Sequence, residues 1–260
     1  MRHSILVALI SIPAVALAAP QPQHHGTQAT PDWQNQVIKA TGQGAPDIRR
    51  QQSPAAARIQ AEKAAELDAL RVVLTKVRGL QLEAGKTVGE QLAQNTELEA
   101  QVQGVIRNYK ITDKRYFSDG GVEVDVEVAL GDVLAELLGK DVGSKLAQAK
   151  PAAASPYSGL VVDAHALKVQ PALAPRIVDQ SGQAVYGAES VTSDAVKLHG
   201  VAGYLKELAA AQKNARVGEK PLVVKALKAQ GPDLTISDAD AAKVRDAAFL
   251  AAGRVIIVAD

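Results

Sequence analysis

Cysteine is absent from this chain of 260 residues, which removes disulfides, thiol catalysis and lipid attachment at an N-terminal cysteine. Aromatic residues make up only 3% of the sequence, so alanine, valine and leucine have to fill the core. There is no basic excess to neutralise nucleic-acid phosphates, because the formal net charge is +1. The length suits one large domain or two small ones, and hydrophobic residues, at 47%, are enough for a core.

The most informative segment that is present is the N-terminus. Met1–His3 is a short basic start, residues 5–19 are apolar, and Ala16–Ala18 is a small-x-small cleavage site. This order is typical of a secretory signal peptide, and the apolar run is too short to remain as a membrane anchor. We therefore expect an exported protein, periplasmic or associated with the outer membrane, with no transmembrane helix after cleavage.

The sequence is predicted to divide into a leader and two units. Residues 1–18 are the signal peptide, and the polar residues 19–32 are predicted to form a flexible leader. Residues 33–149 are predicted to form a first domain and residues 157–260 a second, joined by a Pro/Ala-rich linker at 150–156. The predicted fold class is α+β: an N-terminal strand, a long helix and a β-hairpin, then a second mixed α+β unit.

Two helix starts are marked in the first unit. Ser53 and Pro54 are a good N-cap and first residue for a long helix that Gly79 ends. A capping box that begins at Thr87 predicts a second helix to about Glu99. The apolar residues at helical spacing in the long helix are predicted to face the core, namely Leu67, Leu70, Leu74 and Val77.

The clearest strand signal is a hairpin. Residues 105–117 are strand-like, Ser118–Gly121 is turn sequence, and Val122–Val128 alternates valine with acid. The valines need a buried face, whereas the acids need water. The acids, Glu123, Asp125 and Glu127, form a strip that is either an ordinary solvated face or a docking surface.

The register of this hairpin is argued from charge. Placing Phe117 opposite Val122 keeps Lys114 opposite Asp125. A slip of one residue would place Lys114 opposite a valine on the core face, so the first register is predicted. It leaves two charged residues on the valine face without a packing explanation, Asp113 and Arg115.

Several shorter elements are expected further along the chain. A short helix is predicted after Gly131. The strands predicted in the second unit are 160–162, 171–178, 184–186, 222–227 and 254–258, with a turn at Asp179–Gly182. The helices predicted there are 201–212 and 237–249, the latter capped by Ser237 with Asp238 and Asp240 as helix-start charges.

No complete catalytic, metal or cofactor site is apparent in the sequence. Asp163 and His165 share a strand face and His199 could join them, but a Gly-x-Ser-x-Gly nucleophile turn is lacking. His24 and His25 are too few to close a metal site. The Gly-x-Gly spacing in the strand predicted at residues 37–44 lacks the third glycine of a nucleotide-binding turn. We expect no catalytic residues, no metal and no cofactor.

Two segments of the first unit carry a family resemblance. The alanine-rich run Ala61–Leu70 is followed by the hairpin sequence Tyr116–Val124. Together they resemble a family of bacterial envelope lipoproteins that includes the flagellar protein FlgP and the N-terminal domain of FlgT. The resemblance covers about residues 33–130 and implies a small α+β domain that builds structures at or near the outer membrane. Many members are lipidated through an N-terminal cysteine, which this chain lacks.

Two classes of function remain. The favoured one is a non-catalytic exported component of the cell envelope, structural or assembly-related, with flagellar association among the roles that the resemblance implies. Its expected partners are other envelope proteins or further copies of this chain. The alternative is a periplasmic ligand-binding protein or small hydrolase that uses the second domain. The scarcity of aromatic residues argues against that alternative, because small-molecule pockets are usually rich in them.

Overall fold

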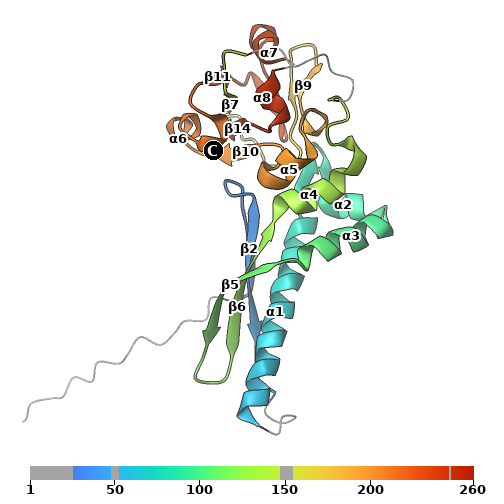
Figure 1. Ribbon diagram of the computed structural model, residues 1–260, viewed down its shortest axis with the longest axis vertical. Helices are drawn as coiled ribbons and strands as arrows, with labels where there is room; N and C mark the ends of the chain where they lie inside the picture. The colour runs from blue at the N-terminus through green and yellow to red at the C-terminus, as the bar shows by residue number, and fades with distance from the viewer. Residues whose placement is uncertain (1–25, 48–52, 147–154, 246) are drawn as a thin grey trace, which may run out of the picture.

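The computed structural model describes residues 26–47, 53–146, 155–245 and 247–260. An elongated first unit, one long helix on an antiparallel sheet, projects from a rounder second unit built on a parallel sheet (Figure 1). This mixture of helices and sheets confirms the α+β fold class. The predicted signal peptide and residues 150–154 of the predicted linker lie outside the described residues.

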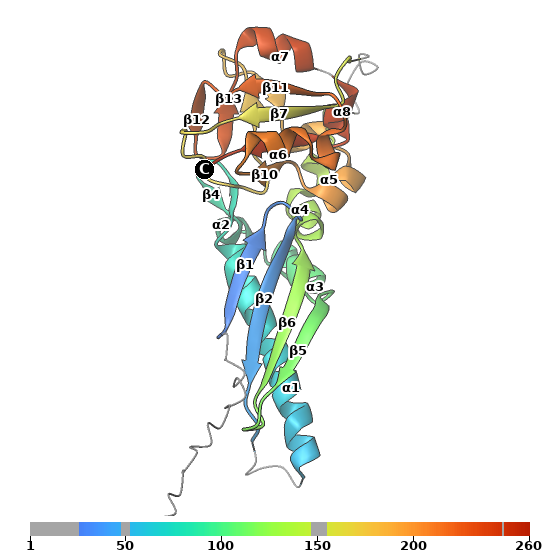
Figure 2. The ribbon, with the colours of Figure 1, turned by 90° about the vertical axis from the view of Figure 1, so that its left-hand side faces the viewer.

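The sheet of the first unit has the strand order β1-β2-β6-β5, with every neighbouring pair antiparallel. Its strands are β1 (Gln28–Asp32), β2 (Val37–Gly44), β5 (Lys110–Tyr116) and β6 (Val122–Ala129). The strands lie in front of helix α1 (Pro54–Arg78), which covers one face of the sheet (Figure 2). The valines of β6 are buried beneath this helix.

Strand β1 corrects the expected leader, because Gln28–Asp32 is ordered as a strand and the chain is not structureless up to residue 32. It pairs with residues 37–41 of β2 at the edge of the sheet. An edge strand needs only backbone hydrogen bonds on one side, so a polar sequence that contains Pro31 can take this place. The polar composition was therefore a poor guide to order here.

Helix α1 begins as predicted, since the Ser53 side chain accepts a hydrogen bond from the Ala56 amide. The predicted core face is wrong at Leu67, which is 68% exposed. Leu70 and Leu74 are partly buried and pack against the core, and Val77 is fully buried as predicted. The buried stripe consists of small residues and two valines, Ala57, Ala61, Ala65, Ala69, Val73 and Val77.

Two glycines of β2 explain why small residues face the sheet. A Cβ atom at Gly42 would lie 2.2 Å from the Ala65 carbonyl oxygen, and one at Gly44 would lie 1.9 Å from the Ala61 carbonyl oxygen. The helix backbone therefore lies directly on the strand backbone, and only alanine fits between them. The Gly-x-Gly spacing serves this close approach.

The segment after α1 contains two short helices where one was predicted. The hairpin β3 (Gln81–Glu83) and β4 (Lys86–Thr87) leads into α2 (Val88–Ala93), whose capping box is formed as predicted. Asn95 then caps a new helix, α3 (Thr96–Ile106), through its side-chain oxygen. The residues predicted as the first part of strand 105–117 therefore end this helix instead.

The register of the β5–β6 hairpin is the rejected one. Tyr116 lies opposite Val122 and Lys114 lies opposite Val124, with a bulge between Ile111 and Asp113. Lys114 is nevertheless paired, because β5 is an edge strand and the ammonium group reaches the carboxylates of Glu62 and Glu66 on α1. The slip also moves Arg115 and Asp113 to the acid-bearing face, which removes the packing problem of the predicted register.

The second unit contains two sheets. The larger one has the order β10-β14-β7-β11 with parallel pairing throughout. Its strands are β7 (Gly159–Asp163), β10 (Gly203–Leu205), β11 (Pro221–Lys225) and β14 (Val255–Val258). The smaller sheet consists of β8 (Ile177–Val178), β9 (Ala184–Tyr186), β12 (Lys228–Gln230) and β13 (Asp233–Thr235). The predicted strand positions near 160, 184, 222 and 255 are confirmed.

The helices of this unit are short. They are α5 (Ser193–His199), α6 (Leu208–Gln212), α7 (Asp238–Val244) and α8 (Ala248–Ala251). Ser237 caps α7 as predicted, but the helix ends at Val244 and does not run to residue 249. The helix predicted at 201–212 is confirmed only in its last part, as α6. Its first part is wrong, because residues 203–205 form β10, which pairs with β14 at the edge of the sheet.

The two units share one continuous hydrophobic core. Helix α4 (Leu130–Leu138) packs on α5 so closely that a Cβ atom at Gly131 would lie 2.1 Å from the Lys197 carbonyl oxygen. The β3 strand also receives backbone hydrogen bonds from the second unit, from the Leu173 and Ala174 amides. Among the described residues, no helix combines the length and apolarity needed to cross a bilayer.

Candidate functional site

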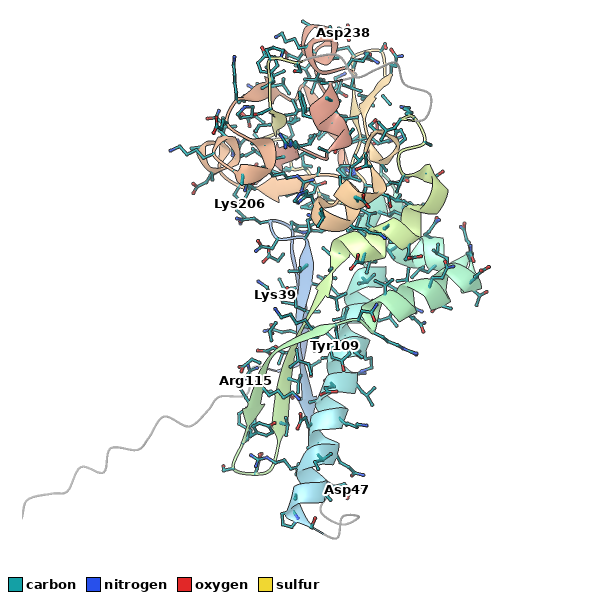
Figure 3. All side chains as sticks on the ribbon, viewed as in Figure 1. Lys39, Asp47, Tyr109, Arg115, Lys206 and Asp238 are labelled. Atoms are coloured by element: carbon teal, nitrogen blue, oxygen red, sulfur yellow. The ribbon has the colours of Figure 1, made fainter. Side chains whose placement is uncertain are left out.

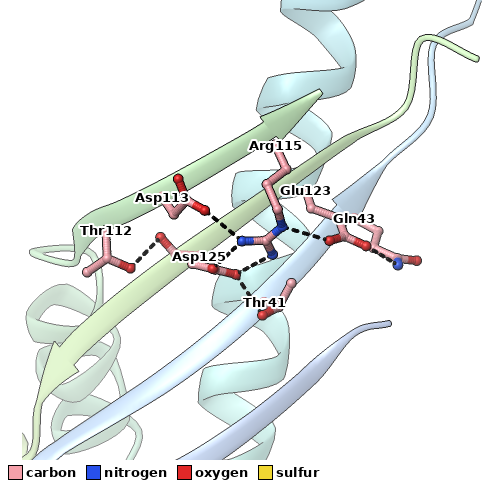
Figure 4. A network of polar contacts seen from close by, with 7 residues as sticks. All are labelled: Thr41, Gln43, Thr112, Asp113, Arg115, Glu123 and Asp125. Carbon is pink, nitrogen blue, oxygen red and sulfur yellow. Dashed lines mark hydrogen bonds and ion pairs between the residues drawn. The ribbon is translucent and has the colours of Figure 1, made fainter. Parts of the chain in front are cut away.

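The acidic strip predicted on β6 is organised by Arg115 of β5 (Figure 4). The Arg115 guanidinium binds both carboxylate oxygens of Asp125, at 2.5 and 2.9 Å, and its Nε lies 3.1 Å from a Glu123 oxygen. A third carboxylate, that of Asp113, lies 2.8 Å from Nη1. The hydrogen bond to Asp125, followed by those to Asp113 and Glu123, raises the pKa of Arg115.

Strand β2 completes this network. The Thr41 hydroxyl donates to Asp125 at 2.7 Å, and the Gln43 side-chain amide donates to Glu123 at 3.0 Å. Glu123 is fully buried, which contradicts the expectation that all the strip's acids point to water. A buried carboxylate requires partners, and Arg115 and Gln43 supply them. The repulsion expected between neighbouring acids is thus relieved inside the molecule.

Glu127, the third acid of the strip, lies away from this network. It is paired in register with Lys39 on β2 and with Lys110 on β5. Lys39 and Arg115 are both carried by the sheet of the first unit (Figure 3). A shallow cavity of about 310 Å³ opens on this sheet, lined by residues that include Thr30, Lys39 and Glu127. We call this side of the sheet, which faces away from α1, the open sheet face.

The second predicted group, Asp163 and His165, is formed but is not joined by His199. His165 Nδ1 lies 2.7 Å from the Asp163 carboxylate, and its Nε2 lies 2.8 Å from the Lys206 carbonyl oxygen. Since both partners accept hydrogen bonds, both ring nitrogens carry protons in this geometry. The hydrogen bond to Lys206, then that to Asp163, raises the pKa of His165. The imidazole has no free nitrogen for a base or a metal ligand.

His199 lies at the end of α5, beside a larger cavity. No hydrogen bond or ion pair in the described part of the chain links it to Asp163 or His165, and the described residues hold no group of three metal-binding side chains. Partial burial, followed by the positive charges of Arg216 and Arg254, lowers the pKa of His199. The hydrolase-like set suggested by the sequence is therefore not assembled.

The cavity beside His199 has a volume of about 610 Å³. We call it the junction cavity, because residues of both units line it. The turn between β1 and β2 contributes Gln34–Gln36, and the second unit contributes residues from α5, β10 and the segments around Arg216 and Arg254. The described residues that line it include no aspartate or glutamate.

The β1–β2 turn is held firmly against the second unit. Trp33 contacts the Tyr204 ring edge-on, with ring centroids 5.6 Å apart. The Gln36 side-chain amide donates to the carbonyl oxygens of Trp33 and Ala202, at 2.7 and 3.4 Å. Gln36 has a φ of 55°, an uncommon conformation for a residue other than glycine, and this turn needs it. These contacts join the wall formed by the β1–β2 turn to the wall formed by the second unit.

Arg216 is one of the residues that line the junction cavity. Its guanidinium donates to the carbonyl oxygens of Gly253, Gly200 and Val201, at 2.8, 3.1 and 3.1 Å, and also to that of His199. None of the ion pairs between described residues includes Arg216. Burial lowers its pKa to about 10, so the group is still charged at neutral pH.

Sequence reasoning did not single out Arg216 or Arg254. The carbonyl groups that surround Arg216 come from residues 199–201 and 253, which are remote from it in the chain. No local motif marks such a set, because its members carry no distinctive side chain. Only the turn of the chain after α5, where Gly200 has a φ of 66°, is visible as a glycine in the sequence.

Comparison with models of protein families gives a match to the second unit. Residues 159–260 match the model of a family described as the second domain of Treponema pallidum Tp0624. The matched segment begins with β7 and spans the second unit, which is less than half of the chain. No curated protein matches the chain. The second unit is therefore similar to that domain.

Proposed function

We propose that this protein is a non-catalytic, exported component of the cell envelope, with a structural or assembly role, that docks on another protein through the open sheet face. The observation that carries the proposal is the asymmetry of the first sheet. One face is buried under α1, whereas the other presents an ordered array of charged and hydroxyl groups. Antiparallel sheets commonly pack one face on the core and leave the other in water, where a partner can reach it.

The side chains on the open sheet face are held in fixed positions, which supports a binding surface over an ordinary solvated one. Arg115 is fixed by three carboxylates, so its neighbours on β6 and β2 have little rotational freedom left to lose on association. The exposed part of the face around Glu127 and Lys39 carries charges of both signs. Its expected partner is an envelope protein, or a second copy of this chain, with a complementary mixed-charge surface.

The location is proposed from the N-terminal sequence and the family resemblance. The leader over residues 1–18 has the composition of a signal peptide, which supports export to the periplasm. The resemblance of the first unit to envelope lipoproteins, flagellar proteins among them, supports a place at or near the outer membrane. The elongated first unit suits such a role, because its 25-residue helix extends for about 37 Å.

The test alters the exposed part of the face and spares Arg115. The double variant Thr30→Lys plus Glu127→Lys changes two residues that line the shallow cavity. Asp125 is left intact, because its pairing with Arg115 gives it a structural role. The matched control, Gln212→Lys plus Glu219→Lys, makes the same charge change on exposed positions of the second unit.

Cross-linking in cells and sizing chromatography of the purified protein provide the measurement. We expect the double variant to lose its cross-linked partner or its self-association, since like charge placed at a polar interface suppresses docking. The control should keep both. If the double variant retains every partner and oligomer seen for the unaltered protein, the open sheet face is an ordinary solvated surface.

A further inference from the structure

We infer that the junction cavity is a binding site for a small organic anion, whose carboxylate or phosphate group is held near Arg216, Arg254 and His199. This site is separate from the open sheet face and goes beyond the proposed docking function. The inference starts from the composition of the lining. Two arginines and a histidine meet there, and none of the described lining residues is acidic.

The guanidinium of Arg216 is held in a fixed orientation before any ligand binds. Carbonyl oxygens from two separate segments orient its planar guanidinium, but these groups are dipoles and carry no net charge. Arg254 lines the same cavity and forms none of the ion pairs found between described residues. Positive charge is thus concentrated without a compensating carboxylate. An anionic ligand would supply that charge, and arginine is the side chain best suited to carboxylates and phosphates.

The positive charge of the two arginines also acts on His199, which lines the same cavity. Besides partial burial, Arg216 and Arg254 lower its pKa. An anion bound between the three groups would offset this repulsion and favour the protonated imidazolium. Ligand binding is therefore expected to be accompanied by proton uptake at His199.

The remaining lining indicates the kind of molecule that fits. Apolar contacts are available from Leu198, which is 72% exposed, and from Ala215. Neutral hydrogen-bonding groups are available from Gln34 and Asn35 of the first unit and Asn214 of the second. A cavity of about 610 Å³ is of the size that holds small organic ligands. The class is therefore an oxyanion attached to a compact, partly apolar body.

The position of the cavity gives such a ligand a further effect. One wall is the β1–β2 turn of the first unit, and the opposite walls belong to the second unit. A ligand that contacts both walls would stabilise their arrangement, because it binds only when the turn is in place. Binding should therefore raise the melting temperature of the protein.

The experiment measures binding of three probes to the full chain by calorimetry and thermal unfolding. Benzoate and phenyl phosphate carry the two candidate oxyanions on the same ring, and benzamide is the neutral counterpart of benzoate. We expect saturable binding of one or both anions at millimolar concentration, an increase in melting temperature, and no binding of benzamide. The stronger of the two anions identifies the head group that the site prefers.

Three variants place the binding in the cavity. Arg254→Gln should weaken anion binding by about tenfold, the usual loss for one charge-assisted contact. Gln34→Glu, on the first unit, should weaken it as well by adding a negative charge to the wall. Lys228→Gln, on β12 and outside the lining, removes the same charge as Arg254→Gln and should leave affinity unchanged. Arg216 is kept, because its carbonyl contacts give it a structural role.

NMR titration of His199 gives the remaining readout, since the pKa of this residue should rise when the anion is bound. The inference is overturned if neither anion binds saturably, or if binding is the same in Arg254→Gln as in Lys228→Gln. The Thr30→Lys plus Glu127→Lys variant should bind the anion normally. The docking proposal is therefore tested by the Thr30→Lys plus Glu127→Lys variant, and the ligand-binding inference is tested separately by Arg254→Gln.

Discussion

In the first unit, α1 lies on β2 at a distance set by two glycines, whereas in the second unit the central strands are surrounded by large aliphatic side chains. Gly42 and Gly44 leave no space for a Cβ atom against the helix backbone. In the neighbouring strands β7 and β14, the leucine, valine and isoleucine residues are instead all buried. The packing of α1 on β2 therefore depends on how closely two backbones can approach, whereas the packing around β7 and β14 depends on the volume of side chains.

This difference explains how a chain with so few aromatic residues forms a core. Alanine and glycine bury little apolar surface, so the first unit gains its contact area by bringing two backbones together along a long helix. The second unit buries aliphatic side chains on both faces of a parallel sheet, as such sheets require. The two types of core meet in one cluster at the junction.

The largest effect is expected from a charge placed in that shared core. Val124→Asp puts a carboxylate under α1 at a fully buried position and should cost about 4 kcal/mol of stability. Val223→Asp is the control, because Val223 lies on the edge strand β11 and is 38% exposed. It should cost about 1 kcal/mol or less.

Urea unfolding followed by circular dichroism and by the fluorescence of Trp33 measures both variants. Trp33 is the only tryptophan in the chain and lies against Tyr204, so its emission reports the junction. Because the core is continuous, Val124→Asp should shift both signals together. If the second unit of Val124→Asp unfolds at the same urea concentration as in the unaltered protein, the two cores are energetically separate.

The next effect tests the backbone contact directly. Gly42→Ala adds one methyl group that would lie 2.2 Å from backbone atoms of Ala65 and Ala69, so α1 must move away. We expect a loss of about 3 kcal/mol, as for severe overpacking. Gly104→Ala is the control, since Gly104 lies in α3 with open space around it. Alanine should stabilise that helix by about 0.5–1 kcal/mol.

Ile257→Val provides the matching change in the second unit. Ile257 is fully buried in β14, and loss of one methylene there should cost about 1 kcal/mol. All three values come from denaturant midpoints at a constant slope. If Gly42→Ala costs no more than Ile257→Val, the first unit can adjust its helix, and its packing is no more demanding than that of the second.

Local chemistry accounts for the elements that the sequence predicted well. The Ser53 cap, the Thr87–Glu90 capping box and the Ser237 cap each depend on residues within one turn of each other. The buried strands near residues 160 and 255 are short aliphatic runs that have few alternatives. These features need no knowledge of the rest of the chain.

The elements that were mispredicted depend on distant partners. Leucine spacing wrongly placed Leu67 on the core face of α1 and did not indicate the buried alanines, because nothing near that helix in the sequence reveals the two glycines of β2. The observed register was rejected because it places Lys114 on the core face, and the sequence does not show that Glu62 and Glu66 on α1 pair with it there. Residues 203–205 form a strand because β14, more than 50 residues later, offers them an edge.

The same reasoning applies to the candidate sites. Asp163 and His165 meet because they are two residues apart on one strand end, and the sequence suggested that pair. The junction cavity combines a turn near residue 35 with loops near residues 200, 216 and 254. No periodicity links these segments, so the cavity could be found only from the structure.

The smallest effect distinguishes the two histidines, which the sequence placed in one group. His165 is held by two hydrogen-bond acceptors, and its pKa should lie above 6.5. His199 lies near two arginines, and its pKa should lie below 6.5. As the pH falls from 7.5 to 5.5, protonation of His165 should stabilise the fold, whereas the penalty for protonating His199 should destabilise it. The stabilisation from His165 is lost as the pH rises through its folded-state pKa.

NMR titration of the imidazole resonances measures both values, and single variants to glutamine assign them. His165→Gln should remove the contribution that favours the fold at low pH, and His199→Gln should remove the one that opposes it. The two variants are therefore expected to change the pH dependence of unfolding in opposite directions. If both histidines titrate together near 6.5, neither the acceptors around His165 nor the arginines beside His199 act on them as the geometry requires. The pKa of His199 would then give no support for a concentration of positive charge in the junction cavity.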